Sequence, residues 1–221
     1  MNRMLRLSFT VLVLTLFFTA RQALAVSFTF SNNAPITIND NAPATPYPAT
    51  VTVSGVTARI ADLNVIVTGL SHTFPTDVGI LLIGPTGQTV VLMNNTGGIN
   101  SISNVNLIFD DQAATQVPNP IFGSLASGTY KPTNLAPNDP FAAPAPGIPY
   151  GTSLSAFDGT LANGVWRLFV EDFSAGDSGS ISGGFGLQIT VSEPPPLLLF
   201  FIGIVALGVS SIMRRRSLPL R

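Results

Sequence analysis

The chain has 221 residues, no cysteine, one histidine and a formal net charge of −1. All eleven acidic residues lie in its middle, where only three basic residues offset them, so this part carries a charge near −8. Nucleic-acid binding is therefore excluded, because phosphate contacts need a basic face. Without cysteine, and with a single histidine, disulfides, cysteine nucleophiles and zinc sites of the usual His/Cys kind are excluded as well.

Residues 1–25 are typical of a signal peptide. Arg3 and Arg6 precede an apolar run over residues 11–18, and Ala23-Leu24-Ala25 places small residues at the two positions that a signal peptidase reads. An N-terminal membrane anchor is the alternative, but the apolar run is short for a bilayer span, which needs about 17–25 residues. The sequence therefore predicts export of the domain that follows.

Residues 26–191 are predicted to form an all-β sandwich or barrel. Short runs of Val, Ile, Leu, Phe and Thr are separated by Gly, Pro, Asn and Ser, and helix signals are almost absent. The expected strands cover residues 27–30, 50–53, 60–70, 78–83, 89–93, 105–109, 164–171 and 185–191. The run over 78–83 is nearly all apolar, as in a strand buried on both faces. Gly84-Pro85-Thr86-Gly87 then predicts a tight turn into the next strand.

Residues 112–157 interrupt this pattern, because eight prolines prevent regular strand pairing. One interpretation is a connection packed down between the sheets. The other is a functional or mobile contact surface, since long irregular loops often carry function and proline keeps a segment extended.

The motif Gly176-Asp177-Ser178-Gly179 matches the sequence around the nucleophile of chymotrypsin-like proteases, and His72 and Asp110 precede it in that family's order. Such a triad needs a histidine base and an aspartate that orients it. The surroundings of His72 lack the small residues found around that family's base, and Gly-Asp-Ser-Gly is equally typical of a turn. The turn is the favoured interpretation.

Five aspartates stand beside the ends of expected strands. Asp77 precedes one strand, Asp110 and Asp111 follow another, and Asp172 and Asp177 bracket the loop between them. Strand ends meet at the rim of a sandwich, where carboxylates and loop carbonyls could form the oxygen shell that Ca²⁺ takes. The sequence therefore predicts that these five residues hold Ca²⁺. In the alternatives, each aspartate caps a turn, or a carboxylate pair serves glycoside hydrolysis.

Several motifs resemble the P domain (Homo B domain) of proprotein convertases, most closely its bacterial versions. They lie in order over about residues 54–191 and comprise His72-Thr73-Phe74-Pro75-Thr76-Asp77, Leu82-Ile83-Gly84-Pro85-Thr86-Gly87, Phe109-Asp110-Asp111, Gly128-Thr129-Tyr130-Lys131-Pro132, Asn163-Gly164-Val165-Trp166-Arg167-Leu168 with Asp172, and Gly176-Asp177-Ser178-Gly179 with Leu187. The resemblance implies a jelly-roll-like β-sandwich that usually follows and stabilises a subtilisin-like protease domain. It also implies calcium binding at the five aspartates, and it makes the Gly-Asp-Ser-Gly stretch part of the family's pattern.

The sequence departs from that family in two ways. Phe185 stands where the family usually has tryptophan, and we expect no protease domain in this chain. We therefore expect a non-catalytic exported module that contacts an extracellular protein or polysaccharide matrix and is stabilised by calcium. The alternative is an accessory domain that assists a separate subtilisin-like serine protease.

Residues 192–221 resemble the PEP-CTERM sorting signal of Gram-negative bacteria. A proline-rich spacer over 192–196 begins with Ser192-Glu193-Pro194, in which serine replaces the motif's first proline. An apolar stretch over 197–213 is just long enough for a transmembrane helix, and the basic tail over 214–221 is expected on the cytoplasmic side. The resemblance implies transient membrane anchoring and processing near Glu193-Pro194 by a sorting enzyme, followed by release to the cell surface or beyond. A permanent single-span anchor is the alternative.

Overall fold

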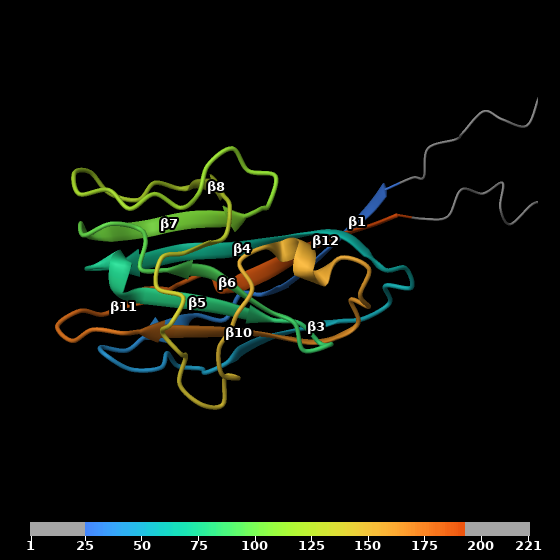
Figure 1. Ribbon diagram of the computed structural model, residues 1–221, viewed down its shortest axis with the longest axis horizontal. Coiled ribbons are helices and arrows are strands. Elements are labelled where there is room, and N and C mark those ends of the chain that lie inside the picture. Colours follow the sequence, from blue (N-terminus) through green and yellow to red (C-terminus); the bar gives the residue numbers. More distant parts are fainter. Residues whose placement is uncertain (1–24, 193–221) are drawn as a thin grey trace, which may run out of the picture. The chain divides into compact units, whose positions relative to one another are not determined.

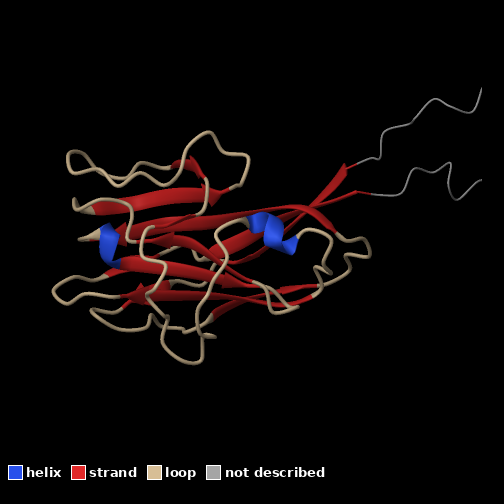
Figure 2. Cartoon of the chain, viewed as in Figure 1, coloured by secondary structure: helices blue, strands red, loops and turns tan. Residues whose placement is uncertain are grey.

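The structure is a computed structural model that describes residues 25–192, and two β-sheets form the framework of this part of the chain (Figures 1 and 2). The expected signal peptide over 1–25, apart from its last residue, lies outside the described residues, as do most of the spacer and all of the expected membrane helix and basic tail. Between residues 25 and 192, no helix is long and apolar enough to cross a membrane.

The larger sheet has seven strands: β1 (Ala25–Asn32), β2 (Ile36–Ile38), β4 (Ile60–His72), β7 (Ile102–Phe109), β8 (Gly128–Tyr130), β11 (Gly179–Ile181) and β12 (Phe185–Ser192). The long strand β4 organises this sheet. β12 and β11 pair with successive parts of its one edge, and β7 pairs with its other edge, all antiparallel. β1 lies beyond β12, β2 lies beyond β11, and β8 adds to β7 in parallel.

The second sheet has five strands in the order β3 (Ala49–Val53), β10 (Gly164–Asp172), β5 (Val78–Ile83), β6 (Thr89–Asn94) and β9 (Thr133–Asn134). β10, β5 and β6 form its antiparallel centre. The predicted all-β class is confirmed, and each of the eight expected strands is present within a few residues of its predicted ends. The four strands that the sequence did not indicate have only two or three residues each.

The main core lies between the two sheets. Inward-facing residues of β4, such as Val65 and Val67, share one buried cluster with Ile80 and Leu82 of β5 and with Trp166 of β10. Because side chains alternate across a strand, β5 and β10 bury every second residue in this shared core, and β4 does so over residues 63–67. The period-two pattern in the sequence therefore placed the correct residues between the sheets.

The outer face of the second sheet has a smaller core of its own. Leu81 and Ile83 of β5 pack there with Val91, Phe169 and Phe141, the last of which belongs to the proline-rich segment. This cover explains why the strand over 78–83 is apolar on both faces, as predicted. It also decides between the two interpretations of residues 112–157 for the part around Phe141, which is packed against a sheet.

Three short turns connect strands of this unit. The turn at 84–87 is closed by the Gly87 N–H, which donates to the Gly84 carbonyl at 3.1 Å, and Gly87 has φ +94°, as glycine there allows. The 3₁₀ turn η1 (Pro75–Asp77) leads from β4 into β5, and η2 (Leu154–Phe157) precedes β10.

Candidate functional site

One end of the two-sheet unit, at the left of Figure 1, contains the candidate functional site. β4 ends there at His72, β10 ends at Asp172, and η1 and the loop after β10 run beside them. Pairing brings these segments together, because Gly179 lies opposite His72 and Asp172 lies opposite Val78. We refer to the aspartates of this region as the acidic end, which comprises Asp40, Asp77, Asp139, Asp172 and Asp177.

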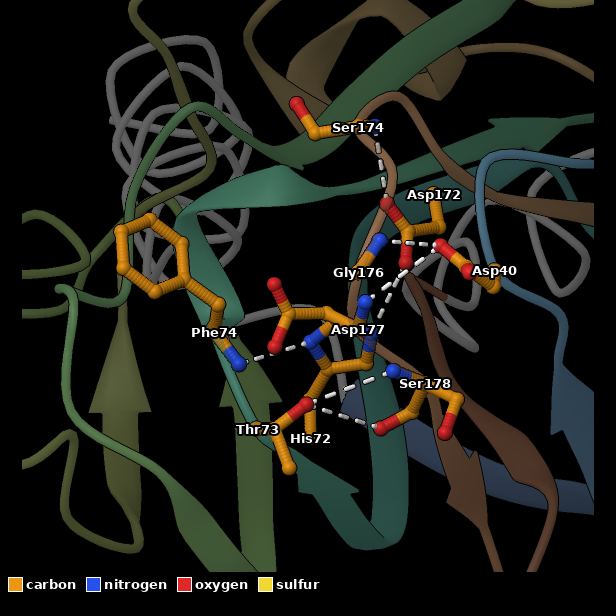
Figure 3. Close-up of polar contacts among 9 residues, drawn as sticks. All are labelled: Asp40, His72, Thr73, Phe74, Asp172, Ser174, Gly176, Asp177 and Ser178. Carbon is orange, nitrogen blue, oxygen red and sulfur yellow. Dashed lines mark hydrogen bonds and ion pairs between the residues drawn. The ribbon is translucent and has the colours of Figure 1, made fainter.

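His72 and Asp172 form a buried pair at this end (Figure 3). Their side chains are fully inaccessible, and Nε2 of His72 lies 3.2 Å from Oδ2 of Asp172. Nδ1 of His72 accepts the Phe74 N–H at 3.2 Å, so the proton of the neutral ring belongs on Nε2, facing the carboxylate. The alignment of the pair falls short of a good hydrogen bond, and the two facing atoms have no other partner among the described residues.

The buried carboxylate of Asp172 has a second contact through its other oxygen. Oδ1 accepts the Ser174 N–H at 2.9 Å. Burial nevertheless raises the pKa of Asp172, and the Ser174 N–H and His72 offset only part of that effect. The two side chains are therefore packed inside the end of the sandwich and are not exposed to a substrate.

The Gly-Asp-Ser-Gly motif forms the loop that leads into β11, as the turn interpretation predicted. Oδ1 of Asp40 accepts the N–H groups of Gly176 and Asp177, at 2.7 and 3.3 Å, and so anchors the loop (Figure 3). Gly176 has φ +110°, a conformation that favours glycine. The Ser178 N–H donates to the Thr73 hydroxyl at 3.3 Å, which ties the loop to the end of β4.

His72, Asp110 and Ser178 do not form a catalytic triad. A general base must reach the nucleophile with a free nitrogen. Both ring nitrogens of His72 are directed elsewhere, one to the Phe74 N–H and the other to Asp172. Asp110 lies near the other end of β4, since Phe109 pairs with Val65 whereas His72 pairs with Ile102.

Asp110 and Asp111 are separated from the other three predicted calcium ligands. The seven steps along β4 from Val65 to His72 correspond to roughly 23 Å at about 3.3 Å per residue. Asp111 accepts the N–H groups of Leu154 and Ser155, at 2.9 and 2.8 Å, and so caps η2. Oδ1 of Asp110 accepts the N–H of its second neighbour, Gln112, at 2.7 Å. Asp110 and Asp111 thus cap turns, as the alternative interpretation of the aspartates predicted. The five aspartates do not lie together at one site.

The carboxylates as they stand do not fit a calcium ion. Calcium takes six to eight oxygen ligands at 2.3–2.6 Å. Over residues 25–192, no three or more acidic or histidine side chains are grouped in an arrangement that could hold a metal ion. At the acidic end, Asp40 and Asp172 use oxygens to accept backbone N–H groups. Calcium binding remains a prediction from the resemblance, without support from this geometry.

A polar cavity of about 320 Å³ opens beside this network. Its walls are Thr76 and Asp77 of η1, Asn94 and Asn95 at the end of β6, Phe173 and Ser174 after β10, and Asp139 of the proline-rich segment. Burial, followed by the nearby carboxylates of Asp172 and Asp177, raises the pKa of Asp77. The cavity is therefore an acidic site, lined by two carboxyl groups of which Asp77 is partly desolvated.

Sequence reasoning missed part of this cavity. Asp77 was among the predicted site residues, but Asn94, Asn95 and Asp139 were not. The asparagines begin an Asn/Gly-rich loop, and Asn95 has φ +53°, which this residue type tolerates better than most. That composition was a usable signal of a special backbone conformation. Asp139 had no such signal, because it reaches the cavity only through the folding of the proline-rich segment.

Comparison with known proteins adds little to this picture. No family model matches the sequence, and no curated protein is similar to it. One similar structure is that of the Aeromonas sobria serine protease in complex with the chaperone, with a TM-score of 0.40 and 13% identity over 83% of this chain and 29% of that one. Another is that of the serine protease of Aeromonas sobria, with a TM-score of 0.32 and 15% identity over 77% of this chain and 27% of that one. The chain spans less than a third of those chains, and a likeness at this level assigns no function.

Proposed function

We propose that residues 26–192 form an exported, non-catalytic module that binds other macromolecules at the cell surface or in the extracellular matrix. One observation carries this proposal. At the acidic end, both ring nitrogens of His72 face packing partners and the backbone of Ser178 is held in a turn contact, whereas a polar cavity beside them is open. The arrangement has a place for a ligand but no base directed at a nucleophile.

The strand order supports the P-domain-like interpretation of the fold. The long strands form one row β1-β12-β4-β7 and another row β3-β10-β5-β6. A chain that alternates between two sheets in this order has jelly-roll topology, a double-sheet architecture used by many binding domains. Fold alone does not assign function, so the proposal depends on the acidic end.

An accessory role beside a separate serine protease is the second candidate. The resemblance of the six motifs to the P domain favours it, because members of that family stabilise a neighbouring protease domain. Co-purification with a subtilisin-like protease, together with a higher melting temperature of that protease in the complex, would distinguish this role from contact with a matrix.

The test of the main proposal measures turnover and binding on the same preparation. We expect no hydrolysis of casein or of polysaccharide substrates that depends on Ser178 or Asp110, and saturable binding to immobilised surface material from the producing cells. Ser178→Ala and Asp110→Ala are compared with Ser103→Ala, which changes an exposed serine of β7. Turnover that disappears in Ser178→Ala or Asp110→Ala while the fold stays intact would contradict the proposal.

A further inference from the structure

The charge of the cavity indicates what kind of group it would accept. Two of its seven lining residues, Asp77 and Asp139, are carboxylates, and no basic residue lines it. None of the three basic residues of the described part lines the cavity. Arg59 donates to the Gly159 carbonyl, Arg167 lies within β10, and Lys131 follows β8. The cavity thus contains two carboxylates and has no basic residue in its lining.

The hydrogen-bonding groups of the cavity are mainly acceptors. Asn94 is only 2% exposed, and its Nδ2 donates to Oδ1 of Asn134 and to the Ala136 carbonyl, at 3.3 and 3.1 Å. Its own Oδ1 accepts no hydrogen bond from any residue between 25 and 192. This oxygen is not among the fully buried unpaired atoms of the described residues, so it is accessible from the cavity. A ligand that brings several N–H groups would satisfy this oxygen together with the two carboxylates.

The size of the cavity fits a side chain better than a bare ion. About 320 Å³ is roughly ten times the ~30 Å³ that one water molecule occupies in the liquid. An arginine guanidinium brings five N–H donors in a fixed planar geometry that matches carboxylates, whereas a lysine ammonium brings three.

An exposed apolar feature lies beside the cavity. Ile99, Ile121 and Phe122, here called the apolar tip, are 45%, 69% and 93% exposed. They lie on two loops that are hydrogen-bonded to each other, since the Gly97 N–H donates to the Pro118 carbonyl at 2.8 Å and Nδ2 of Asn100 donates to the Gly123 carbonyl at 2.7 Å.

The tip is tied to the wall of the cavity. The Thr76 hydroxyl, which lines the cavity, lies 3.3 Å from Oδ1 of Asn95 and 3.3 Å from Oδ1 of Asn119. Asn119 belongs to the tip loop, and its Oδ1 also accepts the Gly98 N–H at 3.0 Å. An exposed aromatic side chain on a loop that is hydrogen-bonded to the wall of a charged cavity is typical of a protein interface, where aromatic and arginine residues are enriched.

We propose that the acidic end binds an arginine side chain of a partner protein in this cavity, while the apolar tip packs against an apolar residue next to that arginine. This inference rests on the proposed function, because it names the chemistry of the partner that the module binds. The carboxylates of Asp77 and Asp139 and Oδ1 of Asn94 accept the guanidinium N–H groups, and Phe122 supplies apolar contact.

The experiment measures fluorescence polarisation of a labelled decapeptide of alternating leucine and arginine, with the 221-residue chain as the binding protein. The matched control peptide carries citrulline, which has arginine's shape without its charge. We expect the citrulline peptide to bind at least tenfold more weakly. We expect a similar loss for the arginine peptide with Asp77→Asn, Asp139→Asn or Phe122→Ser. Asp139 and Phe122 are exposed, so the last two variants test the proposal without disturbing the core.

Control variants change similar residues at the other end of β4. Asp158→Asn removes a carboxylate near Asp62 and Asp111, and Leu161→Ser removes an apolar side chain that is also exposed. Both should leave peptide binding within twofold of the unchanged chain. Equal binding of the two peptides, or equal loss in the control and cavity variants, would overturn the inference. If saturable binding to surface material persists in that case, only the inference fails. If it is absent too, the proposed function fails with it.

Discussion

Asp111 is held by the backbone of a distant segment. Its carboxylate accepts the N–H groups of Leu154 and Ser155 at the start of η2. The first N–H groups of a helix have no partner within the helix, so a carboxylate placed there stabilises it. From its position after a strand, Asp111 was predicted to be a metal ligand. The contact with η2 shows that its carboxylate caps a turn instead.

We predict that Asp111→Ala lowers the free energy of unfolding by about 1–2 kcal/mol, the usual cost of losing a capping side chain. Urea unfolding followed by Trp166 fluorescence measures this change, because that residue is buried between the sheets. Asp139→Ala serves as the control, since Asp139 is exposed. Equal stability of Asp111→Ala and the unchanged protein would contradict the capping role.

Asp77 provides a prediction about pH. Its pKa in the folded protein is raised above 3.8 by burial and by Asp172 and Asp177. The folded state therefore binds this proton more tightly than the unfolded state does, and the contribution to stability falls as pH rises from about 3.8 through the higher folded-state pKa.

In Asp77→Asn, that contribution to the pH dependence is absent. We expect the free energy of unfolding of the variant to decrease less between pH 4 and pH 7 than that of the unchanged protein. Urea unfolding at several pH values in this range measures the difference. Asp139→Asn removes the other cavity carboxylate and serves as the comparison. A steeper decrease in Asp77→Asn would show that the sign is wrong.

At the scale of elements, the proline-rich segment behaves as an added layer on the second sheet. Phe141 is buried there against Phe173, with ring centroids 5.4 Å apart, and it packs with Leu81 and Phe169. Glu171 fastens the same segment, since its Oε2 accepts the Ala142 N–H at 2.8 Å and the Tyr47 hydroxyl at 3.0 Å. Burial and the carboxylate of Glu171 accordingly raise the pKa of Tyr47 well above its usual value.

We predict that Phe141→Ala destabilises the domain by roughly 3–5 kcal/mol, as expected for removing a buried aromatic side chain. Phe122→Ala is the matched control, because Phe122 is 93% exposed and its removal should change stability by less than about 0.5 kcal/mol. Thermal and urea unfolding measure both changes. Limited proteolysis should also cut residues 136–150 faster in Phe141→Ala alone. Similar stability of the two variants would contradict the packing described here.

At the scale of the whole described unit, the two sheets share one core. The burial of apolar side chains in this core accounts for the association of the sheets. Residues 26–192 form one compact unit, and both sheets contribute to the same buried cluster. A domain of this size buries enough apolar surface to be stable from its core.

Calcium removal tests this view of the whole domain. The P-domain resemblance implies that EDTA lowers the melting temperature. The arrangement of the carboxylates implies no change, since the described residues contain no group of three or more that could hold a metal ion. We therefore expect the melting temperature with and without EDTA to agree within about 1 °C, measured by differential scanning calorimetry; a shift of 1 kcal/mol at the transition corresponds to about 2–4 °C for a domain of this size. A decrease of several degrees that added calcium restores would support the resemblance instead.

The sequence by itself determined where the long strands lie and which side chains they bury. The alternation through Leu63, Val65 and Val67 and the apolar run over 78–83 are properties of neighbouring residues, so they are visible without the fold. The Gly-rich turns were visible for the same reason, because a positive φ is a local requirement.

Only the tertiary structure decided which acidic residues meet. Asp40 and Gly176 are 136 positions apart and touch, whereas Asp77 and Asp110 belong to different ends of the sandwich. Strand register and the path of the connections set these distances, and neither can be derived from the local pattern around each aspartate. The same holds for Asp139, which lines the cavity because Phe141 and Ala142 hold its segment against the second sheet.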